Sequence, residues 1–259
     1  MEVKVPHRWD LTPKEAAQLQ IELRPLLKKQ RDFGEIQTVA GADIAVEVAS
    51  TGQKGPKEAV GYAGVIVYSF PGLEEIERRS ARRRLIFPYV PGLLVFREGP
   101  VLLDAFAQLR TEPDLLLFDA HGYSHPRRFG LACHLSAVLD KPGVGVAKSR
   151  LIGYYEEPRD QVGAWSPLVD VEETIGAVLR TRAGVQPVFI SIGHRADLES
   201  AIEIALACTD GYRVPKPTRE ADHFVEQLKR GQTAPEKFSG TQSTSCGGRG
   251  SGCGRPARR

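Results

Sequence analysis

A short, wholly apolar run at 115–118 (LLLF) is the feature that most limits the folds open to this chain. Aspartates stand on either side of it, and the run ends at Asp119. A strand with apolar side chains on both faces has to be covered on both faces, as the central strands of parallel sheets are. The run therefore predicts a buried strand at the centre of an α/β sheet.

The segments around this strand indicate the rest of the sheet. Other strand-like patterns occur at 36–48, 59–70, 74–85, 142–147 and 185–193. Helix-like patterns occur at 13–31 with a kink at Pro25, from a first turn holding Pro100, at 131–139, at 197–211, and in a short segment after 215–220 that carries Asp222. Pro71-Gly72 marks a turn, so the first three strands form an antiparallel meander. A meander followed by alternating helices and strands is the order of a ribonuclease H-like core, a mixed sheet flanked by helices.

Composition supports one folded domain with an extension. The chain has 259 residues, of which 41% are hydrophobic and 26% charged, so whole-chain disorder is excluded. We predict a folded domain at 1–238 and a disordered Gly/Ser/Arg tail at 239–259. No apolar run reaches the roughly 18 residues of a membrane span. The charged N-terminus does not resemble a signal peptide. We therefore expect a cytoplasmic protein that binds no membrane, and the sequence indicates no protein partner.

The net charge of +3 does not by itself indicate nucleic-acid binding. Four of the 35 basic residues are arginines in the predicted tail, which has no acid, so residues 1–238 carry 31 − 32 = −1. Any basic surface must come from local clustering, and the stretch 78–84 holds five arginines. Such a run is usually a solvated face, and the alternative is a strip that follows a nucleic-acid backbone.

The four cysteines do not suggest a disulfide framework or a zinc site. Cys133 and Cys208 lie in apolar, helix-like stretches and are predicted to be small core residues. Cys246 and Cys253 lie in the predicted tail without a second pair of ligands.

Four acids stand out because of their positions. Asp43 lies inside a predicted strand and Asp119 ends another, where an unpaired carboxylate is costly to bury. Either alone is more often satisfied by backbone donors or opens a turn. Neighbouring strands lie only about 4.8 Å apart, so together the two favour a bound cation. Glu98 and Asp222 stand near predicted helix starts, where acids are common in any case. All four together could form an all-oxygen site of the kind that Mg²⁺ or Mn²⁺ prefers.

Two loops carry further candidates. Pro88 and Pro91 bracket Tyr89, which predicts a stiff loop with an exposed aromatic ring that could replace a displaced base. The alternative is a tyrosine packed at the rim of the core. His125 follows Asp119 among further histidines and arginines, which favours phosphate contacts over a zinc site. Lys148 ends another apolar strand and could reach the same edge, or could be an ordinary exposed lysine.

Six motifs resemble, in order and spacing, those of the endonuclease V (deoxyinosine 3′ endonuclease) family. They are GADIAVE, FPYVPGLLVFRE, LLLFDAHGYSHPRRFGLACHLS, KPGVGVAKSRLIG, SIGHRADLESAI and YRVPKPTREAD, within about residues 10–230. The resemblance implies a ribonuclease H-like fold and Mg²⁺ as the cofactor, with Mn²⁺ as a substitute. It also implies hydrolysis of the second phosphodiester bond 3′ of a deaminated purine in DNA, which leaves 3′-hydroxyl and 5′-phosphate ends.

The resemblance also implies roles for single residues. Asp43, Glu98 and Asp119 match the family's catalytic metal-binding acids, and Asp222 falls near its second metal. His125 and Lys148 match catalytic positions near the scissile phosphate. The positions that match the family's DNA contacts are the wedge Tyr89 and the pocket backbone of Gly92, Leu94 and Gly122. The family reads Asp-Gly where this chain has Asp119-Ala120, so a left-handed backbone there would strain the alanine and shift the pocket amide.

Two alternatives stay open at this point. One is a ribonuclease H-like nuclease that prefers inosine-containing RNA or branched nucleic acid, because contacts to the 2′-hydroxyl are not visible in a sequence. The other is a nucleic-acid-binding relative without activity, which has no need to retain four mutually repelling carboxylates. These alternatives can be distinguished by an assay of Mg²⁺-dependent nicking that compares a DNA strand containing inosine with the equivalent RNA strand.

Overall fold

The computed structural model describes residues 1–48 and 58–232, and within them the run LLLF forms the central strand β4 of an eight-stranded mixed sheet. The strand order is β3-β2-β1-β4-β5-β8-β7-β6. The strands are β1 (Thr38–Val48), β2 (Ala59–Ser69), β3 (Glu75–Leu85), β4 (Leu115–Phe118), β5 (Gly143–Ala147), β6 (Trp165–Asp170), β7 (Glu173–Leu179) and β8 (Val188–Ile192). β4 is parallel to β1 and β5, and the other pairs are antiparallel. The predicted meander and the ribonuclease H-like mixed sheet are confirmed.

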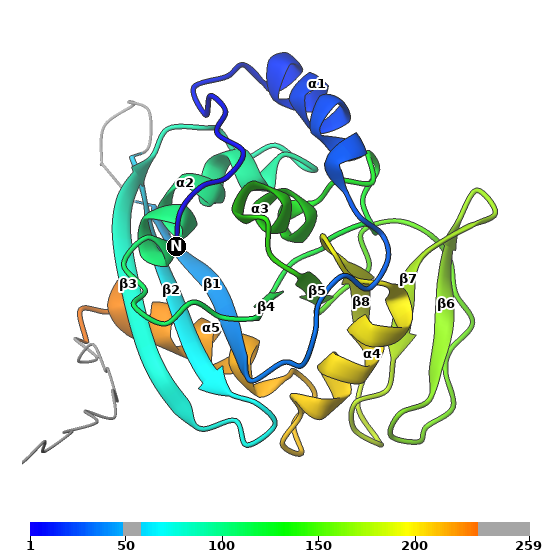
Figure 1. Cartoon of the computed structure of the whole chain (residues 1–259). Helices are drawn as coiled ribbons and strands as arrows, with labels where there is room; N and C mark the ends of the chain where they lie inside the picture. The colour runs from blue at the N-terminus through cyan, green and yellow to red at the C-terminus, as the bar shows by residue number, and fades with distance from the viewer. Residues whose placement is uncertain (49–57, 233–259) are drawn as a thin grey trace, which may run out of the picture.

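Helices cover both faces of this sheet (Figure 1). They are α1 (Pro13–Leu23), followed by the 3₁₀ turn η1 (Arg24–Leu26), α2 (Leu94–Phe106), α3 (Leu131–Leu139), α4 (Leu198–Ala207) and α5 (Lys216–Lys229). Because side chains alternate along a strand, Ala40 and Ala42 of β1 pack in the core beneath α2, while Val39 packs on the side of α5 with Phe224. The helices α2 and α5 therefore lie on opposite faces of the β1 region.

Two helix starts differ from the prediction. α2 begins at Leu94, so Pro100 lies inside it and Glu98 belongs to the helix body, not to its start. A proline inside a helix removes one backbone hydrogen bond and costs about 3 kcal/mol. Burial of Phe96, Val101 and other apolar side chains of α2 offsets that cost. α5 begins at Lys216, several residues earlier than predicted, with Pro217 in its first turn, where proline is tolerated.

The hairpin of β6 and β7 was not predicted. Pro167 lies within β6, and a proline normally argues against a strand because it donates no ladder hydrogen bond. β6 is the edge strand of the sheet, which is where a proline can be accommodated. The interruption predicted near Pro25 is confirmed, because α1 ends at Leu23 and passes into η1, but the predicted helix does not continue to residue 31, since residues 27–31 are not helical.

The five arginines on β3 interact with other side chains of the protein. The acidic partners of four of these arginines are Glu75 for Arg78, Glu77 for Arg79, Asp104 for Arg83 and Glu58 for Arg84. The guanidinium of Arg82 lies over the ring of Tyr62. The run is therefore no free strip for a nucleic-acid backbone.

Three further predictions concern the core, the tail and the membrane. Cys133 and Cys208 are buried and free, as predicted. The domain boundary at 238, the tail 239–259 and the tail cysteines lie outside the described residues. Within the part of the chain that the structure describes, no helix combines the length and apolar character needed to cross a bilayer.

Candidate active site

The parallel pairing of β1 and β4 brings the two strand aspartates together. Ala42 pairs with Phe118, and the next residues along the two strands are Asp43 and Asp119. Both side chains follow the same alternation and point to the face that α5 covers. The sequence prediction that these carboxylates meet at one edge is therefore confirmed by the register.

A third carboxylate reaches this edge because α5 packs very closely against β1. A Cβ atom at Gly41 would lie 2.0 Å from the carbonyl oxygen of Pro217 in the first turn of α5. Only glycine allows this approach of a helix backbone to a strand backbone. The next turn of α5 carries Asp222, and ligand oxygens of Asp43, Asp119 and Asp222 lie within 4.8 Å of one another.

Burial and mutual repulsion perturb this cluster. Burial, followed by the charge of Asp119, raises the pKa of Asp43 to about 8, although Oδ1 accepts a hydrogen bond from the amide of Ile44. Burial also raises the pKa of Asp119, against the opposing charge of Lys148. A buried carboxylate with a raised pKa gains stability from a nearby cation.

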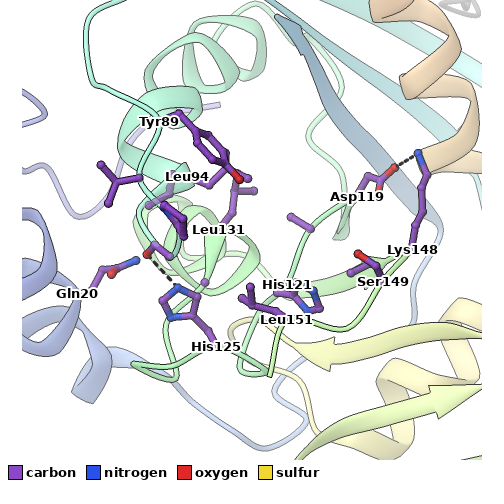
Figure 2. Close-up of a pocket in the computed structure, with 17 residues that line it drawn as sticks. Gln20, Tyr89, Leu94, Asp119, His121, His125, Leu131, Lys148, Ser149 and Leu151 are labelled. Carbon is purple, nitrogen blue, oxygen red and sulfur yellow. Dashed lines mark hydrogen bonds and ion pairs between the residues drawn. The ribbon is translucent and has the colours of Figure 1, made fainter. Parts of the chain in front are cut away.

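Lys148 supplies a cation of the protein to this cluster. Its Nζ lies 2.5 Å from Asp119 Oδ2, as Figure 2 shows. The same Nζ donates a hydrogen bond to Asp222 Oδ2 at 2.7 Å. Burial disfavours the ammonium charge, but the two carboxylates outweigh burial and raise the pKa of Lys148 above its ordinary value. Lys148 thus stays charged next to the aspartates.

The donor set fits a hard divalent cation. All three groups offer carboxylate oxygens, which Mg²⁺ and Mn²⁺ prefer. Asp119 Oδ2 is buried, and its partner is the ammonium of Lys148 at 2.5 Å, which is shared with Asp222. One ammonium does not balance three clustered carboxylates, so a further cation would stabilise them. Asp43, Asp119 and Asp222 are therefore able to hold a metal ion.

Glu98 is not part of this three-carboxylate group. It lies on α2, which covers the opposite face of the sheet from α5. Within residues 1–48 and 58–232 it makes no hydrogen bond or ion pair, and burial raises its pKa to about 8 against the opposing charge of Arg97. The catalytic role that the resemblance implies for Glu98 stays a prediction.

A cavity of about 280 Å³ extends from Asp119, one of the three clustered acids, to the loop around Tyr89. In Figure 2 the ring of Tyr89 lies near Leu94 and Leu131 on one side, and Asp119 with Lys148 lies on the other. The Tyr89 side chain is 70% exposed, so it is not a residue packed at the rim of the core. The cavity thus joins an apolar wall to the acidic cluster.

A pair of donors fixes the loop that carries Tyr89. The carbonyl oxygen of Gly92 accepts hydrogen bonds from His125 Nε2 at 2.9 Å and from a terminal nitrogen of Arg127 at 2.6 Å. Gly92 has a φ of +78°, which favours glycine. Burial lowers the pKa of His125 to about 4, so its ring is neutral at neutral pH. We name this arrangement, Gly92 with His125 and Arg127, the loop clamp.

The loop clamp changes the interpretation of His125. Its Nε2 donates to Gly92, and its Nδ1 accepts a hydrogen bond from the amide of Arg127 at 3.2 Å. Both ring nitrogens are therefore engaged by the protein. The expectation that His125 contacts the scissile phosphate has no support in this geometry, and His125 is better described as a residue that positions the loop.

The pocket backbone is only partly the one expected. Gly92 and Leu94 line the cavity, whereas Gly122 does not. Gly122 is a packing residue, because its amide donates to Ser191 Oγ at 2.8 Å and a Cβ would lie 2.1 Å from the Ile192 carbonyl oxygen. Ala120 lines the cavity instead and does not have a positive φ. The anticipated left-handed strain at Ala120 is therefore absent.

Sequence reasoning missed Gln20, which reaches the cavity from α1. Gln20 is buried, donates to the carbonyl oxygen of Phe129 at 2.9 Å and accepts a hydrogen bond from Arg127 Nε at 2.6 Å. It therefore supports the loop clamp from behind. The available signal was a glutamine four residues after Ala16, on the buried side of a polar helix.

Comparisons with known proteins agree with this geometry. A family model described as Endonuclease V matches residues 18–223. The Endonuclease V of Nostoc sp. strain PCC 7120 is 47% identical over 226 residues, which are 87% of this chain and 99% of that protein. The crystal structure of Streptomyces avermitilis Endonuclease V is 37% identical with a TM-score of 0.79, covering 90% of this chain and 100% of that one.

A further solved neighbour contains nucleic acid. It is the Endonuclease V of Ciona intestinalis, in complex with a 24mer DNA containing an inosine followed by a ribo-adenosine. It is 25% identical with a TM-score of 0.70 and covers 84% of this chain and 98% of that one. From the family match, the near-full-length relatives and the shared fold, it follows that this chain belongs to the endonuclease V family and is a nuclease.

Proposed function

We propose that this nuclease hydrolyses the second phosphodiester bond 3′ of deoxyinosine in DNA in a Mg²⁺-dependent reaction, leaving 3′-hydroxyl and 5′-phosphate ends. The observation that carries the proposal is the cavity between Tyr89 and Asp119, whose carboxylate clusters with those of Asp43 and Asp222. A flipped purine could enter its apolar end while the backbone passes the acidic end. Deoxyinosine arises by deamination of adenine, so the role would be DNA repair.

The acids and Lys148 have different roles in the proposed reaction. Asp43, Asp119 and Asp222 would hold Mg²⁺, with Mn²⁺ as a substitute. When bound, the ion would lower the pKa of an attacking water and stabilise charge on the leaving oxygen. The ammonium of Lys148 lies at this cluster and is suited to a phosphate oxygen. We keep Glu98 as the family's catalytic glutamate, because a pKa of about 8 suits proton exchange near neutral pH.

Tyr89 and the loop clamp would recognise the lesion. Flipping a base leaves a gap in the stack, and the exposed ring of Tyr89, held between Pro88 and Pro91, is suited to fill it. The backbone of Gly92 and Leu94 would line the base pocket. His125 would act indirectly, by holding the Gly92 carbonyl.

The test is nicking of a labelled DNA strand that carries one deoxyinosine, with Mg²⁺ or with a chelator. We expect a single cut one nucleotide beyond the inosine, absent from a matched adenine strand and absent in chelator. Equal cutting of the adenine strand would refute the lesion specificity. Cutting that persists in chelator would refute the metal requirement.

Inosine-containing RNA is a second candidate substrate. The observation that favours it is the Ciona neighbour's ligand, in which a ribo-adenosine follows the inosine. In the proposed reaction that nucleotide precedes the scissile bond, so its 2′-hydroxyl would lie next to the reacting phosphate. Faster single-turnover cutting of an RNA strand than of the DNA strand would transfer the proposal to RNA.

A further inference from the structure

A second hollow adjoins the catalytic cavity at Lys148 and Ser149, which line both. Its volume is about 720 Å³. We call it the Arg150 groove, and define it by Lys148, Ser149, Arg150, Tyr155, Phe189 and Arg213. Figure 2 places Lys148 and Ser149 on the side of the cavity away from Tyr89. The groove therefore continues the cavity beyond the acidic cluster.

The groove carries positive charge that the protein does not neutralise. Within the described parts of the chain, Arg150 and Arg213 form no ion pair with a carboxylate. The acid that lines the groove, Glu157, is paired with Arg180 at 2.7 Å. This contrasts with the arginine run of β3, where four of the five are paired with acids. Unpaired guanidinium groups beside a nuclease centre favour a phosphate ligand.

The groove is also built with defined geometry. A terminal nitrogen of Arg213 donates to the carbonyl oxygens of Lys148, at 2.5 Å, and Pro187, at 2.9 Å, while its buried Nε has no partner. The ring of Tyr155 packs edge-on against Phe189, with 5.5 Å between centroids, and the exposed Arg150 lies 5.8 Å from the Tyr155 ring. An ordered aromatic pair next to an arginine without an acidic partner suits a nucleic-acid strand, because bases stack on aromatic rings and phosphates pair with guanidinium groups.

We propose that the Arg150 groove binds the part of the DNA strand that lies 3′ of the scissile bond, with Arg150 contacting a backbone phosphate there. The inference rests on the proposed function, which gives the strand its direction. If the flipped base occupies the cavity beside Tyr89 and the scissile phosphate lies at Asp119, the strand beyond the cut leaves on the Lys148 side. That side opens into the groove.

The experiment combines strand length with substitution. Fluorescence anisotropy in chelator measures the affinity of the full chain for two labelled inosine strands, one with a long 3′ arm and one ending a single nucleotide after the scissile bond. We expect Arg150→Ala to weaken binding of the long strand about tenfold, as the loss of a hydrogen bond to a charged group does. Binding of the short strand should differ little from wild type, and Arg150→Lys should restore part of the loss.

The matched control is Arg31→Ala, which removes the same charge from a separate hollow near Phe33 and Ile36. If Arg150→Ala weakens both strands equally, or if Arg31→Ala has the same effect, the groove is no subsite and the charge acts generally. If wild type binds both strands equally well, the proposal is also refuted. These outcomes do not depend on cleavage. Failure to cut inosine DNA would refute the proposed function. The difference in affinity between the long and the short strand would still test the groove independently.

Discussion

Two regions of the same sheet bury acids in opposite ways. On β3, Glu77 is fully buried, and its carboxylate pairs with Arg79 at 2.8 Å and accepts hydrogen bonds from the amides of Arg110 and Thr111. On β1 and at the end of β4, Asp43 and Asp119 repel each other, and Asp119 shares the ammonium of Lys148 with Asp222. Glu77 is therefore matched by its own arginine and two amides, whereas the acidic cluster holds three carboxylates around one ammonium.

The difference separates a structural acid from a functional one. Removing one partner of a satisfied buried ion pair leaves an uncompensated charge or donor. Removing one of several repelling carboxylates relieves strain instead, and costs the protein its ability to hold a cation. Burial alone therefore does not identify a catalytic acid, and a cluster of buried carboxylates that outnumber their paired cations is the better indicator.

The largest effect is expected at the clustered acids Asp43 and Asp119. Asp43→Asn and Asp119→Asn should each lower the single-turnover nicking rate at least about a thousandfold, because the charge that holds the cation supplies several kcal/mol in the transition state. In chelator above pH 8, where the Asp43 carboxyl is ionised, their melting temperatures should equal or exceed that of wild type, because a like charge is removed. Substantial nicking by either variant in Mg²⁺ would break the comparison.

Glu77→Gln tests the acid that is paired within the protein. We expect it to lower stability and to retain activity, the opposite of the two aspartate variants. Leaving Arg79 buried without its carboxylate should lower the free energy of unfolding by about 3 kcal/mol. Nicking at a temperature where the variant is folded should be retained, because Glu77 lies on β3, away from the acidic cluster. Urea unfolding measures the first quantity and single-turnover nicking the second. A variant with wild-type stability and lost activity would show that the two regions are not distinct.

Two tyrosines show the same kind of contrast between a structural and a functional residue. Tyr68 is 2% exposed and packs in the core, whereas Tyr89 is 70% exposed. Tyr89→Ala should leave the melting temperature unchanged. It should weaken binding of inosine DNA by roughly tenfold to a hundredfold, because stacking is worth about 1–3 kcal/mol. Tyr89→Phe should keep most of the affinity, since the ring does the stacking. An early-melting Tyr89→Ala that still separates inosine from adenine would disprove the wedge.

How far the sequence predicts this site depends on the range of the contacts. Asp43 and Asp119 could be predicted because each stands out within its own strand, and parallel pairing aligns strand ends. The loop clamp could not, because Gln20 and Arg127 meet across 107 positions of the chain. The β6 strand was missed because Pro167 is acceptable only at an edge, and edge position is a property of the whole sheet.

The last prediction concerns the pH dependence of the free energy of unfolding, which depends on the raised pKa values of the buried acids. In chelator, the pKa of Asp43 is raised from 3.8 to about 8, so between these values the folded state binds one proton more than the unfolded state. The free energy of unfolding should therefore fall as pH rises toward 8, by at most about 1.4 kcal/mol per pH unit. Burial lowers the pKa of His121 and of His125 from 6.5 to about 4, which gives the opposite slope, but only below about pH 6.5.

The window from about pH 6.5 to 8 therefore isolates the raised carboxyls. There, wild type in chelator should lose stability with rising pH, and Asp43→Asn should lose less, because one of the titrating groups is gone. Glu98, with a pKa also raised to about 8, should account for part of what remains, so Glu98→Gln should flatten the curve further. Urea unfolding at several pH values measures these slopes. If Asp43→Asn and wild type have parallel curves across this window, Asp43 is already ionised at pH 6.5, and the acidic edge is compensated within the protein as Glu77 is.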